Sequence, residues 1–402
     1  QSYYPYLDKK KNSYLLEDQC LYFNKISKLS KKSNLWILHS IKNIGTSKFE
    51  FLKYLILCKS NITFLEKEIK FSDYFKLFFL LISNLLISFK ITKKISNENN
   101  KLNFFIRYGI SKSIISKNFV YSLSAYFAYK NIFNKCKFLK KFIYLFENQS
   151  WEKAANINKL STFKTIAYNH TSISSEYLFF YISYLDHNSL AIKQSLPNVI
   201  AANSSYSKLQ LSKYYSNIDI KEVEALRHNH LKNTHYSENK SIQNIFFLLS
   251  IDSYESEIIY NFIYDILNDN RFNSYNIDVK LHPSLKIKMN NIYSNRINII
   301  NDNDYNHYLN NSKYIVCGTS SSSIEAIYAG GVILVPNSIL TYFKPPIYDF
   351  PDMINVFNNI DDFYEKLNSK KDINIDKVNN FKKLYWNINY SLPENFKRIV
   401  DE

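Results

Sequence analysis

Two short segments in the second half of the chain hold residue types that could carry chemistry. In the segment "VKLHPS" (279–284), His282 follows an apolar run. In "YIVCGTSSSSIEAIYAGGVILVP" (314–336), Gly318, Thr319 and four serines follow a second apolar run. An imidazole and hydroxyl groups can all donate hydrogen bonds to phosphate oxygens. The two segments together predict a site for an anionic ligand.

The four serines, Ser320, Ser321, Ser322 and Ser323, occupy the predicted first turn of a helix. Free backbone N–H groups and the helix dipole attract anions at such an end, and each serine adds a hydroxyl. One serine that caps the helix would account for only one of the four. The segment therefore predicts a phosphate site without the glycines and lysine of a P-loop. Glu325 follows in the first turns, where it could reach ribose hydroxyls or complement the dipole.

His282 comes directly after the predicted strand, and Pro283 then fixes the backbone where a helix can begin. Ligands of open α/β sheets bind at the carboxyl ends of the strands. A histidine at this place is either an ordinary turn residue or a phosphate contact, and both interpretations stay open on the residues alone.

The elements that must position these residues alternate along the second half. Apolar runs of strand length alternate with helical patterns, which is typical of a doubly wound parallel sheet. The predicted strands there are 244–251, 276–281, 297–300, 314–317 and 332–336, with a helix at 284–294 among those between them. In the first half we predict strands at 34–41, 141–148, 162–170 and 198–203, and helices near 47–58, 71–91, 111–135 and 150–160. Both halves are therefore α/β, and the first is rich in helices.

The length of 402 residues exceeds one ordinary core, so two domains are expected. Residues 232–243 are polar and lack periodicity, which favours a linker. We expect a first domain at 1–235, a second domain that carries the predicted phosphate site at 236–375, and a C-terminal helix in 376–402 that packs back on the first domain.

The net charge of +16, from 51 basic and 35 acidic residues, favours an anionic membrane surface or an anionic substrate, unless lysine serves only solubility. No zinc finger, ribonucleoprotein-type aromatic motif or dense basic helix is present, which argues against nucleic acid. The four cysteines form no CxxC pair, so a reducing cytoplasm fits best. "NDND" (301–304) precedes a helix, and we interpret it as capping rather than as a metal motif.

One apolar segment, "FKLFFLLISNLLISFKI" (75–91), raises the question of a membrane. The run between Lys76 and Lys90 is shorter than the roughly 20 residues that a spanning helix needs, and it contains Ser83 and Asn84. We predict a helix largely buried in the first domain, with a helix lying in the membrane interface as the alternative.

The pairing of "HP" with a later serine-rich turn resembles bacterial sialyltransferases, polysialyltransferases and Kdo transferases. The resemblance implies a GT-B-like α/β fold, with two Rossmann-like domains facing a central cleft and a helix-rich N-terminal domain. It also implies an inverting enzyme that uses a CMP-activated acidic sugar. In that group the histidine and paired serines contact the CMP phosphate. The implied nucleotide-sugar site comprises His282, Pro283, Gly318, Thr319, Ser320, Ser321, Ser322, Ser323 and Glu325, and which two serines correspond stays open.

A second resemblance lies in "FENQSWEKAANINKL", "TFKTIAYNHTSIS" and "VEALRHNHL". These segments look like bacterial surface-carbohydrate biosynthesis proteins implicated in lipopolysaccharide or capsule assembly. The similarity covers about residues 140–335, and the first 130 residues are unmatched. It implies an oligosaccharide or glycolipid as the acceptor.

An inverting transferase needs a base on the acceptor hydroxyl. Glu147 is our first choice because it ends a predicted strand. Glu152 and His170 are the alternatives, although Glu152 could be a helix-start charge and His170 a loop residue. The predicted acceptor pocket comprises Asn148, Gln149, Glu152, Asn169, His170 and Thr171. Arg227 and Lys280 could meet the donor carboxylate, with surface placement favoured for Lys280.

The function implied is transfer of sialic acid, Kdo or a related nonulosonate from a CMP-sugar to a surface glycan. No cofactor or metal is expected. The expected place is the cytoplasm, with peripheral contact at the inner face of the cytoplasmic membrane. Two alternatives stay open: a UDP- or GDP-sugar-dependent GT-B glycosyltransferase or epimerase, and a non-catalytic subunit that binds carbohydrate or membrane.

Overall fold

The computed structural model describes most of the 402-residue chain. The described residues are 35–38, 61–96, 101–175, 180–182, 189–233, 240–282, 296–318, 320–340, 347–369, 374–388 and 393–402. Pro283, Thr319 and the helices predicted at 47–58 and 284–294 lie outside them.

A parallel sheet organises the first unit. Its strands are β3 (Lys141–Leu145), β4 (Lys164–Asn169), β5 (Val199–Ala202) and β6 (Asp219–Glu222), hydrogen-bonded in that order and all parallel. The helices α7 (Ser150–Ile157), α8 (Leu190–Ser195) and α9 (Ser205–Tyr214) connect them. Every residue of the β5 sequence VIAA is buried, as expected for an apolar strand covered on both faces. A smaller parallel pair, β1 (Leu35–Leu38) with β2 (Asn61–Phe64), accompanies this unit.

The second unit is a six-stranded parallel sheet with the order β12-β11-β10-β7-β8-β9. Its strands are β7 (Ser241–Leu248), β8 (Asn276–Lys280), β9 (Ile297–Ile299), β10 (Ser312–Cys317), β11 (Val332–Pro336) and β12 (Ile354–Phe357). The chain runs outward from β7 to β9 and then returns to the other side of β7 as β10. This reversal is the Rossmann strand order, and ligands of such sheets bind where the order reverses.

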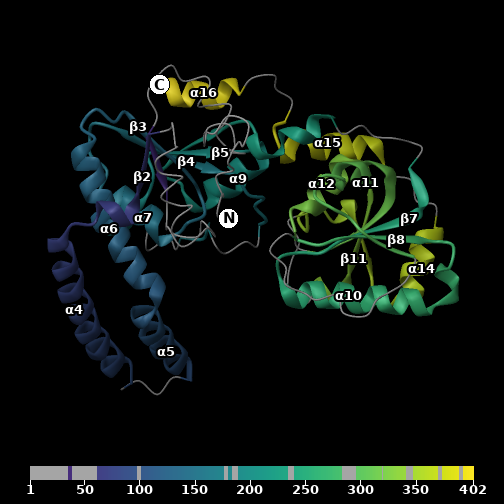
Figure 1. The fold of residues 1–402 in the computed structure, drawn as a ribbon, viewed down its shortest axis with the longest axis horizontal. Coiled ribbons are helices and arrows are strands. Elements are labelled where there is room, and N and C mark those ends of the chain that lie inside the picture. The colour runs from purple at the N-terminus through teal and green to yellow at the C-terminus, as the bar shows by residue number, and fades with distance from the viewer. Residues whose placement is uncertain are drawn as a thin grey trace, which may run out of the picture.

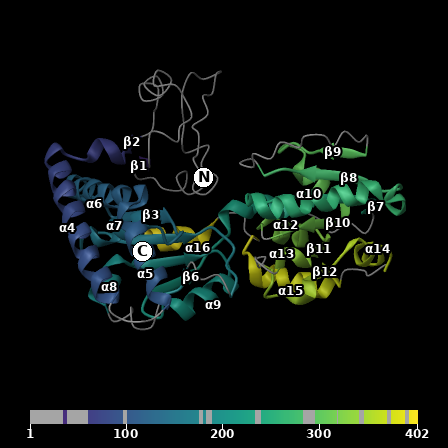
Figure 2. The same cartoon turned by 90° about the horizontal axis from the view of Figure 1, so that it is seen from below.

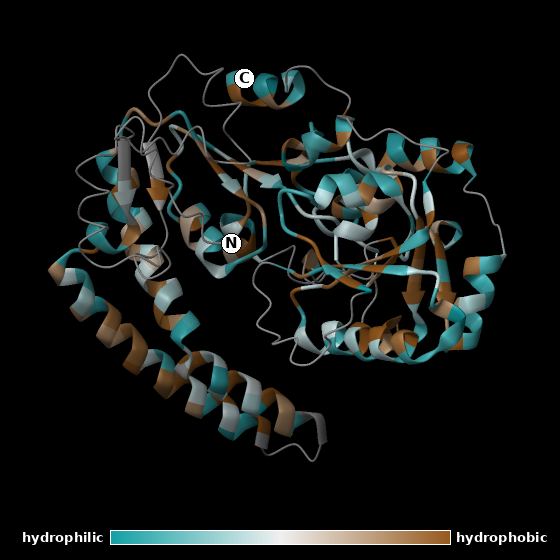
Figure 3. Cartoon of the chain, turned by 45° about the vertical axis from the view of Figure 1, so that its right-hand side comes forward, coloured by the Kyte–Doolittle hydropathy of each residue, from teal (hydrophilic) through white to brown (hydrophobic). Residues whose placement is uncertain are grey.

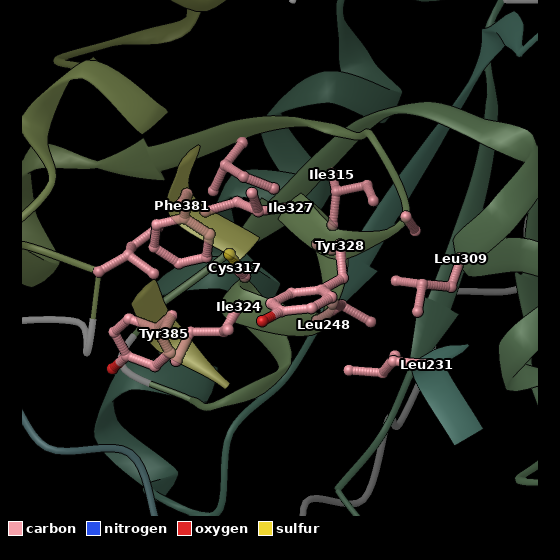
Figure 4. Packing of buried hydrophobic residues seen from close by; sticks show 14 of the residues in the cluster. Leu231, Leu248, Leu309, Ile315, Cys317, Ile324, Ile327, Tyr328, Phe381 and Tyr385 are labelled. Carbon is pink, nitrogen blue, oxygen red and sulfur yellow. The ribbon is translucent and has the colours of Figure 1, made fainter. Parts of the chain in front are cut away.

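Two apolar layers cover the second sheet. Its helices are α10 (Ser253–Asn268), α11 (Tyr305–Asn311), α12 (Ser322–Tyr328), α13 (Asn337–Leu340), α14 (Ile360–Asn368) and α15 (Ile375–Tyr385). Successive strand residues face opposite sides, so Ile315 of β10 packs with α12 and α15 and Val316 packs with α10 and α14. Figure 4 shows the first layer, where Ile327 and Tyr328 of α12 lie between Ile315 and the α15 ring Phe381. Figure 1 shows α10 on one face and α11, α12 and α15 on the other.

The end of the chain returns to the first unit as α16 (Glu394–Asp401). Phe396 and Ile399 of α16 join the apolar cluster of β4 and β5. The carboxylate of Glu224, after β6, accepts hydrogen bonds from the N–H groups of Asn395 (2.8 Å) and Phe396 (2.9 Å) at the start of α16. Two parallel α/β units of this kind form a GT-B-like fold, as the sequence predicted.

Polar contacts join the two units. Asp349, before β12, accepts hydrogen bonds from the Ser175 N–H (2.6 Å) and the Tyr206 hydroxyl (2.5 Å) of the first unit. The Ala225 N–H donates to the Asn387 carbonyl at 2.8 Å. Figure 2 shows the two units side by side.

The helical part of the first unit corrects one prediction. It comprises η2 (Leu65–Glu68), α4 (Phe71–Ser96), α5 (Lys101–Ile115) and α6 (Lys117–Lys135). Only 6% of the most apolar stretch of α4 is buried, so the prediction of a largely buried helix is wrong. Within the described residues, α4 is the one helix long and apolar enough to cross a membrane, with a mean hydropathy of 1.7. Apolarity alone suggested burial, but large apolar side chains of α4 such as Phe71, Phe79 and Phe89 are 66–79% exposed, and Figure 3 shows the apolar colouring along this helix.

Candidate functional site

Glu147 and His170 meet at the carboxyl edge of the first sheet. β3 and β4 are neighbours, and these two residues follow their ends, so parallel pairing brings them together. The Nε2 atom of His170 lies 3.3 Å from Oε1 of Glu147, whose side chain is 40% exposed. The contact with His170 lowers the pKa of Glu147 against the opposing effect of burial, and the nearby positive charge of Arg227 acts in the same direction. Glu147 is therefore an ionised, accessible carboxylate at neutral pH.

The buried side chain of Glu152 stabilises the turn after Glu147 through hydrogen bonds to its backbone. Its Oε1 atom accepts hydrogen bonds from the N–H groups of Glu147 (2.9 Å) and Gln149 (3.0 Å) at the start of α7. Asn148 between them has a φ of 52°, a left-handed conformation that asparagine tolerates better than most residues. Burial raises the pKa of Glu152 to about 8. Glu152 is thus a buried support of the turn, and Glu147 is the carboxylate that the turn exposes.

The predicted acceptor residues lie around this turn. Asn169 is fully buried at the end of β4, and its Nδ2 donates to Oγ1 of Thr171 at 3.4 Å. Its Oδ1 atom has no hydrogen-bond partner among the described residues. Gln149 is exposed and Thr171 is half-buried. The structure therefore brings Asn148, Gln149, Asn169, His170 and Thr171 to one edge of the sheet.

On the second sheet, the serine turn follows β10 and is largely bonded to itself. The Oγ of buried Ser323 donates to the Ser320 carbonyl at 2.7 Å, and Oγ of Ser320 accepts the Ser322 N–H at 3.3 Å. The Oγ of Ser322 is buried with no hydrogen-bond partner in the described part of the chain. Ser320, Ser321 and Ser322 are half-buried, so three of the four serines remain near the surface of the turn.

A buried carboxyl group beside Gly318 was not predicted. A Cβ on Gly318 would lie 1.9 Å from Oε1 of Glu255, so only glycine fits against this side chain. Glu255 lies in the first turn of α10 and is fully buried. A carboxyl group disfavours an anion next to it. Ser320 to Ser322, rather than Gly318, are therefore the part of the turn suited to an anionic ligand.

Glu325 links the two units. Its Oε2 atom accepts a hydrogen bond from the Tyr305 hydroxyl at 2.8 Å, and its Oε1 atom lies 3.4 Å from Nδ1 of His228. The ring of His228 stacks on Trp386 with centroids 3.5 Å apart. Burial lowers the pKa of His228 to about 4, so the imidazole is neutral and can donate to Glu325. His228 belongs to η5 (Leu226–Asn233) of the first unit, and its place against α12 depends on the tertiary fold.

His282 lies at the same edge of the second sheet as the serine turn, but not beside it. β7 separates β8 from β10, so two strand spacings, about 10 Å, separate the two strand ends. That is too far for a direct hydrogen bond and short enough for one phosphate-bearing ligand to contact both. Burial, and then the charges of Lys280 and Arg227, lower the pKa of His282.

Lys280 and the segment 301–304 differ from their predicted roles. Nζ of Lys280 lies 2.6 Å from Oδ1 of Asp302 and donates to the Leu281 carbonyl at 2.7 Å, so Lys280 is already paired. Asp304 stands at the N-cap position of α11, but its side chain makes no capping hydrogen bond. The prediction that this segment caps the helix is therefore wrong for the side chain of Asp304.

Arg227 connects the candidate residues of the two units. It lies in η5 after the first sheet, beside His228. Its positive charge lowers the pKa of Glu147 on the first sheet and of His282 on the second. The sequence suggested Arg227 only as a partner of a donor carboxylate, and the structure places it in η5, next to His228, which contacts Glu325 of the second unit.

A metal site is not apparent: among the residues that the structure describes, no group of three or more His, Cys, Asp or Glu side chains could hold a metal ion.

Comparisons with known proteins give matches only among solved structures. No protein-family model matches the sequence, and no curated protein matches it. The UDP-GlcNAc 2-epimerase from Methanocaldococcus jannaschii, in complex with UDP-GlcNAc and UDP, is 13% identical with a TM-score of 0.43 over 71% of this chain and 81% of that chain. The S. aureus MnaA–UDP structure is 11% identical, with a TM-score of 0.46 over 71% of this chain and 80% of that chain. The glycosyltransferase of kitacinnamycin is 8% identical, with a TM-score of 0.47 over 72% of this chain and 83% of that chain. At these identities the likeness concerns the fold alone.

Proposed function

We propose that the protein is a nucleotide-sugar-dependent glycosyltransferase that inverts the configuration of the transferred sugar. One observation carries the proposal: an accessible carboxylate, Glu147, lies 3.3 Å from His170 at the carboxyl edge of the first sheet, and His282 and the serine turn lie at the carboxyl edge of the second, where its strand order reverses. A base on one sheet and an imidazole with hydroxyl groups on the other suit a reaction between a hydroxyl acceptor and an anionic donor.

The proposed reaction is a single displacement. The Glu147 carboxylate takes the proton of the acceptor hydroxyl while that oxygen attacks the anomeric carbon of the donor sugar. The bond from the anomeric carbon to the nucleotide phosphate breaks, and the phosphate leaves with both electrons. His282 donates a hydrogen bond to the departing phosphate, and Arg227 offsets its charge. The depressed pKa of Glu147 supports this role because the residue is ionised at neutral pH.

For the donor we propose a CMP-activated acidic sugar. The resemblance of the "HP" and serine segments supports this choice, and so does the guanidinium of Arg227, which is suited to a sugar carboxylate. Ser320 and Ser321, which are half-buried, would contact the phosphate. The acceptor would lie against Gln149 and Thr171, beside Glu147. A UDP- or GDP-sugar would use the same phosphate contacts, and a donor comparison separates these alternatives.

The test is donor hydrolysis and transfer by the full chain with CMP-, UDP- and GDP-sugars, each with and without a glycan acceptor. We expect release of CMP, and a loss of about 10²-fold or more in His282→Ala, the range of a removed transition-state contact. His307→Ala is the matched control, because His307 is exposed on α11 of the same unit. If the protein turned over only the UDP-sugar, the donor would be a UDP-sugar and the proposal of a CMP-sugar would be wrong. Absence of any nucleotide binding would instead favour a non-catalytic carbohydrate- or membrane-binding subunit.

A further inference from the structure

The outer side of α4 carries large apolar side chains that face solvent. Their spacing places them on one side of an α-helix over about 27 Å of its length. The stripe comprises Phe71, Phe75, Phe78, Phe79, Ile82, Leu86 and Phe89, with exposed fractions from 40% for Ile82 to 79% for Phe71. Soluble proteins rarely leave such a continuous apolar surface uncovered, so the stripe indicates a partner.

The opposite side of α4 is the one that packs against the protein. Asp73, Leu77 and Ser88 are buried there. Oδ2 of Asp73 accepts hydrogen bonds from Nδ2 of Asn131 in α6 (2.8 Å) and from the Lys70 N–H (3.0 Å). These contacts fix the rotation of α4 about its axis with the aromatic stripe outward. The outward side of α4 therefore carries large apolar side chains, where a soluble helix usually carries polar ones.

Three polar side chains of α4 are hydrogen-bonded to carbonyl groups of the helix itself. Nδ2 of Asn84 donates to the Leu80 carbonyl at 2.8 Å, and Oγ of Ser88 donates to the Leu85 carbonyl at 2.7 Å. Oγ1 of Thr92 donates to the Ser88 carbonyl at 2.8 Å. Internal bonds of this kind lower the cost of placing hydroxyl and amide groups beside hydrocarbon. The helix could therefore pack against lipid hydrocarbon as well as against a protein surface.

The neighbouring helix α5 extends the same kind of surface. Phe104, Phe105 and Tyr108 are 64%, 68% and 57% exposed. Nδ2 of Asn103 donates to the Ile95 carbonyl at 3.2 Å and ties the start of α5 to the end of α4. Figures 1 and 3 show the two helices as a hairpin that projects from the first unit, with long apolar stretches along it.

The charges of the hairpin are almost all positive. The sequence of 71–117 has two acidic residues, Glu98 and the buried Asp73, against eight basic ones. The basic residues there are Lys76, Lys90, Lys93, Lys94, Lys101, Arg107, Lys112 and Lys117. Apolar stripes flanked by lysine and arginine suit a membrane surface that contains anionic lipids, where long basic side chains reach the headgroups. Self-association would bring these like charges together, which disfavours a second copy as the partner.

We propose that the hairpin of α4 and α5 lies in the interface of an anionic membrane, with the stripe of α4 among the acyl chains. A crossing is disfavoured because η2 before the hairpin and α6 after it pack together in the first unit. If α4 crossed, α5 would have to cross back, but its 15 residues span about 22 Å and the hydrocarbon core is about 30 Å thick. Arg107 also lies in the middle of α5.

The experiment is flotation of the full chain with vesicles of phosphatidylcholine, with and without phosphatidylglycerol. We expect binding that increases with phosphatidylglycerol and weakens with salt. The double substitution Phe78→Asp/Phe89→Asp should lower the partition coefficient by roughly 100-fold or more, because it puts two charges into the apolar stripe.

The matched control is Phe138→Asp/Leu209→Asp, which changes two apolar residues outside the hairpin that are 94% and 59% exposed. It should bind vesicles like the unchanged protein, and circular dichroism should show the same helix content in both variants. Absence of vesicle binding, or equal loss in both variants, would overturn the proposal. A third outcome would also overturn the proposal. If the protein does not bind vesicles but self-associates in their absence, and Phe78→Asp/Phe89→Asp abolishes that self-association, the surface binds a second copy of the chain.

Discussion

Glu152 gives the sharpest test of the turn that presents Glu147. Its side chain is 2% exposed and its Oε1 atom caps α7, while burial raises its pKa from the ordinary 4.5 to about 8. Below pH 4.5 the carboxyl group holds its proton in both the folded and the unfolded chain. Between pH 4.5 and 8 the folded chain keeps the proton and the unfolded chain has lost it. The contribution of Glu152 to stability is therefore lost as the pH rises through this window.

The magnitude follows from the width of that window. Each pH unit corresponds to about 1.4 kcal/mol, so the free energy of unfolding falls by on the order of 5 kcal/mol between pH 4.5 and 8 through this group alone. Glu152→Gln keeps an oxygen that can accept the capping N–H bonds, but it cannot ionise. The variant should therefore gain stability relative to the unchanged protein as the pH rises, by an amount of this order at pH 8.

The assay is urea unfolding at intervals from pH 4.5 to 9, with the difference in unfolding free energy plotted against pH. Glu365→Gln on the exposed face of α14 is the control, because it removes the same charge from the surface. Parallel pH profiles for the unchanged protein and Glu152→Gln would show that Glu152 ionises normally, and the account of the turn would be wrong.

Further predictions follow from single contacts. Glu147→Gln should lower sugar transfer by about 10²–10⁴-fold with unchanged donor affinity, measured by steady-state kinetics and calorimetry; full transfer activity would remove it as the base. Gly318→Ala should cost about 1–3 kcal/mol in urea unfolding because its Cβ would overlap the Glu255 carboxyl group, whereas Gly109→Ala, with no atom within 4 Å, should gain about 0.5–1 kcal/mol. Equal effects of the two glycine substitutions would contradict that contact. Trp386→Ala should cost about 3–5 kcal/mol, because a fully buried ring that joins the two units is lost; a loss below 1 kcal/mol would mean that the stacking does not hold the units together.

Five of the six strands of the second sheet were predicted because their sequences contain short apolar runs, and β12 (Ile354–Phe357), at the edge of the sheet, was missed. β10 and β11, for example, are nearly uniform runs of buried residues. β6, with the sequence DIKE, was missed because an edge strand of alternating charged residues has no apolar run. β2 was missed as well, and it pairs with only one described strand. Patterns of hydropathy therefore identify central strands better than edge strands.

Other features depend on contacts between distant segments. Glu147 and His170 were named from the sequence because each ends a strand, and parallel pairing then brings them together. The stacking of His228 on Trp386 and the place of Glu255 beside Gly318 have no local signal. The exposure of α4 was not predictable either, since the same apolar residues suit a protein core and a lipid surface.

The central claim is that an anionic nucleotide binds near Arg227, between Glu147 and His282. Calorimetric titration of the full chain with CMP, UDP and GDP at low salt, repeated with Arg227→Ala, tests it most directly. The account predicts saturable binding of CMP that Arg227→Ala weakens by about tenfold to 100-fold, as expected for a lost charged hydrogen bond. Equal CMP affinity in the variant, or no binding of any nucleotide by the unchanged protein, would contradict it.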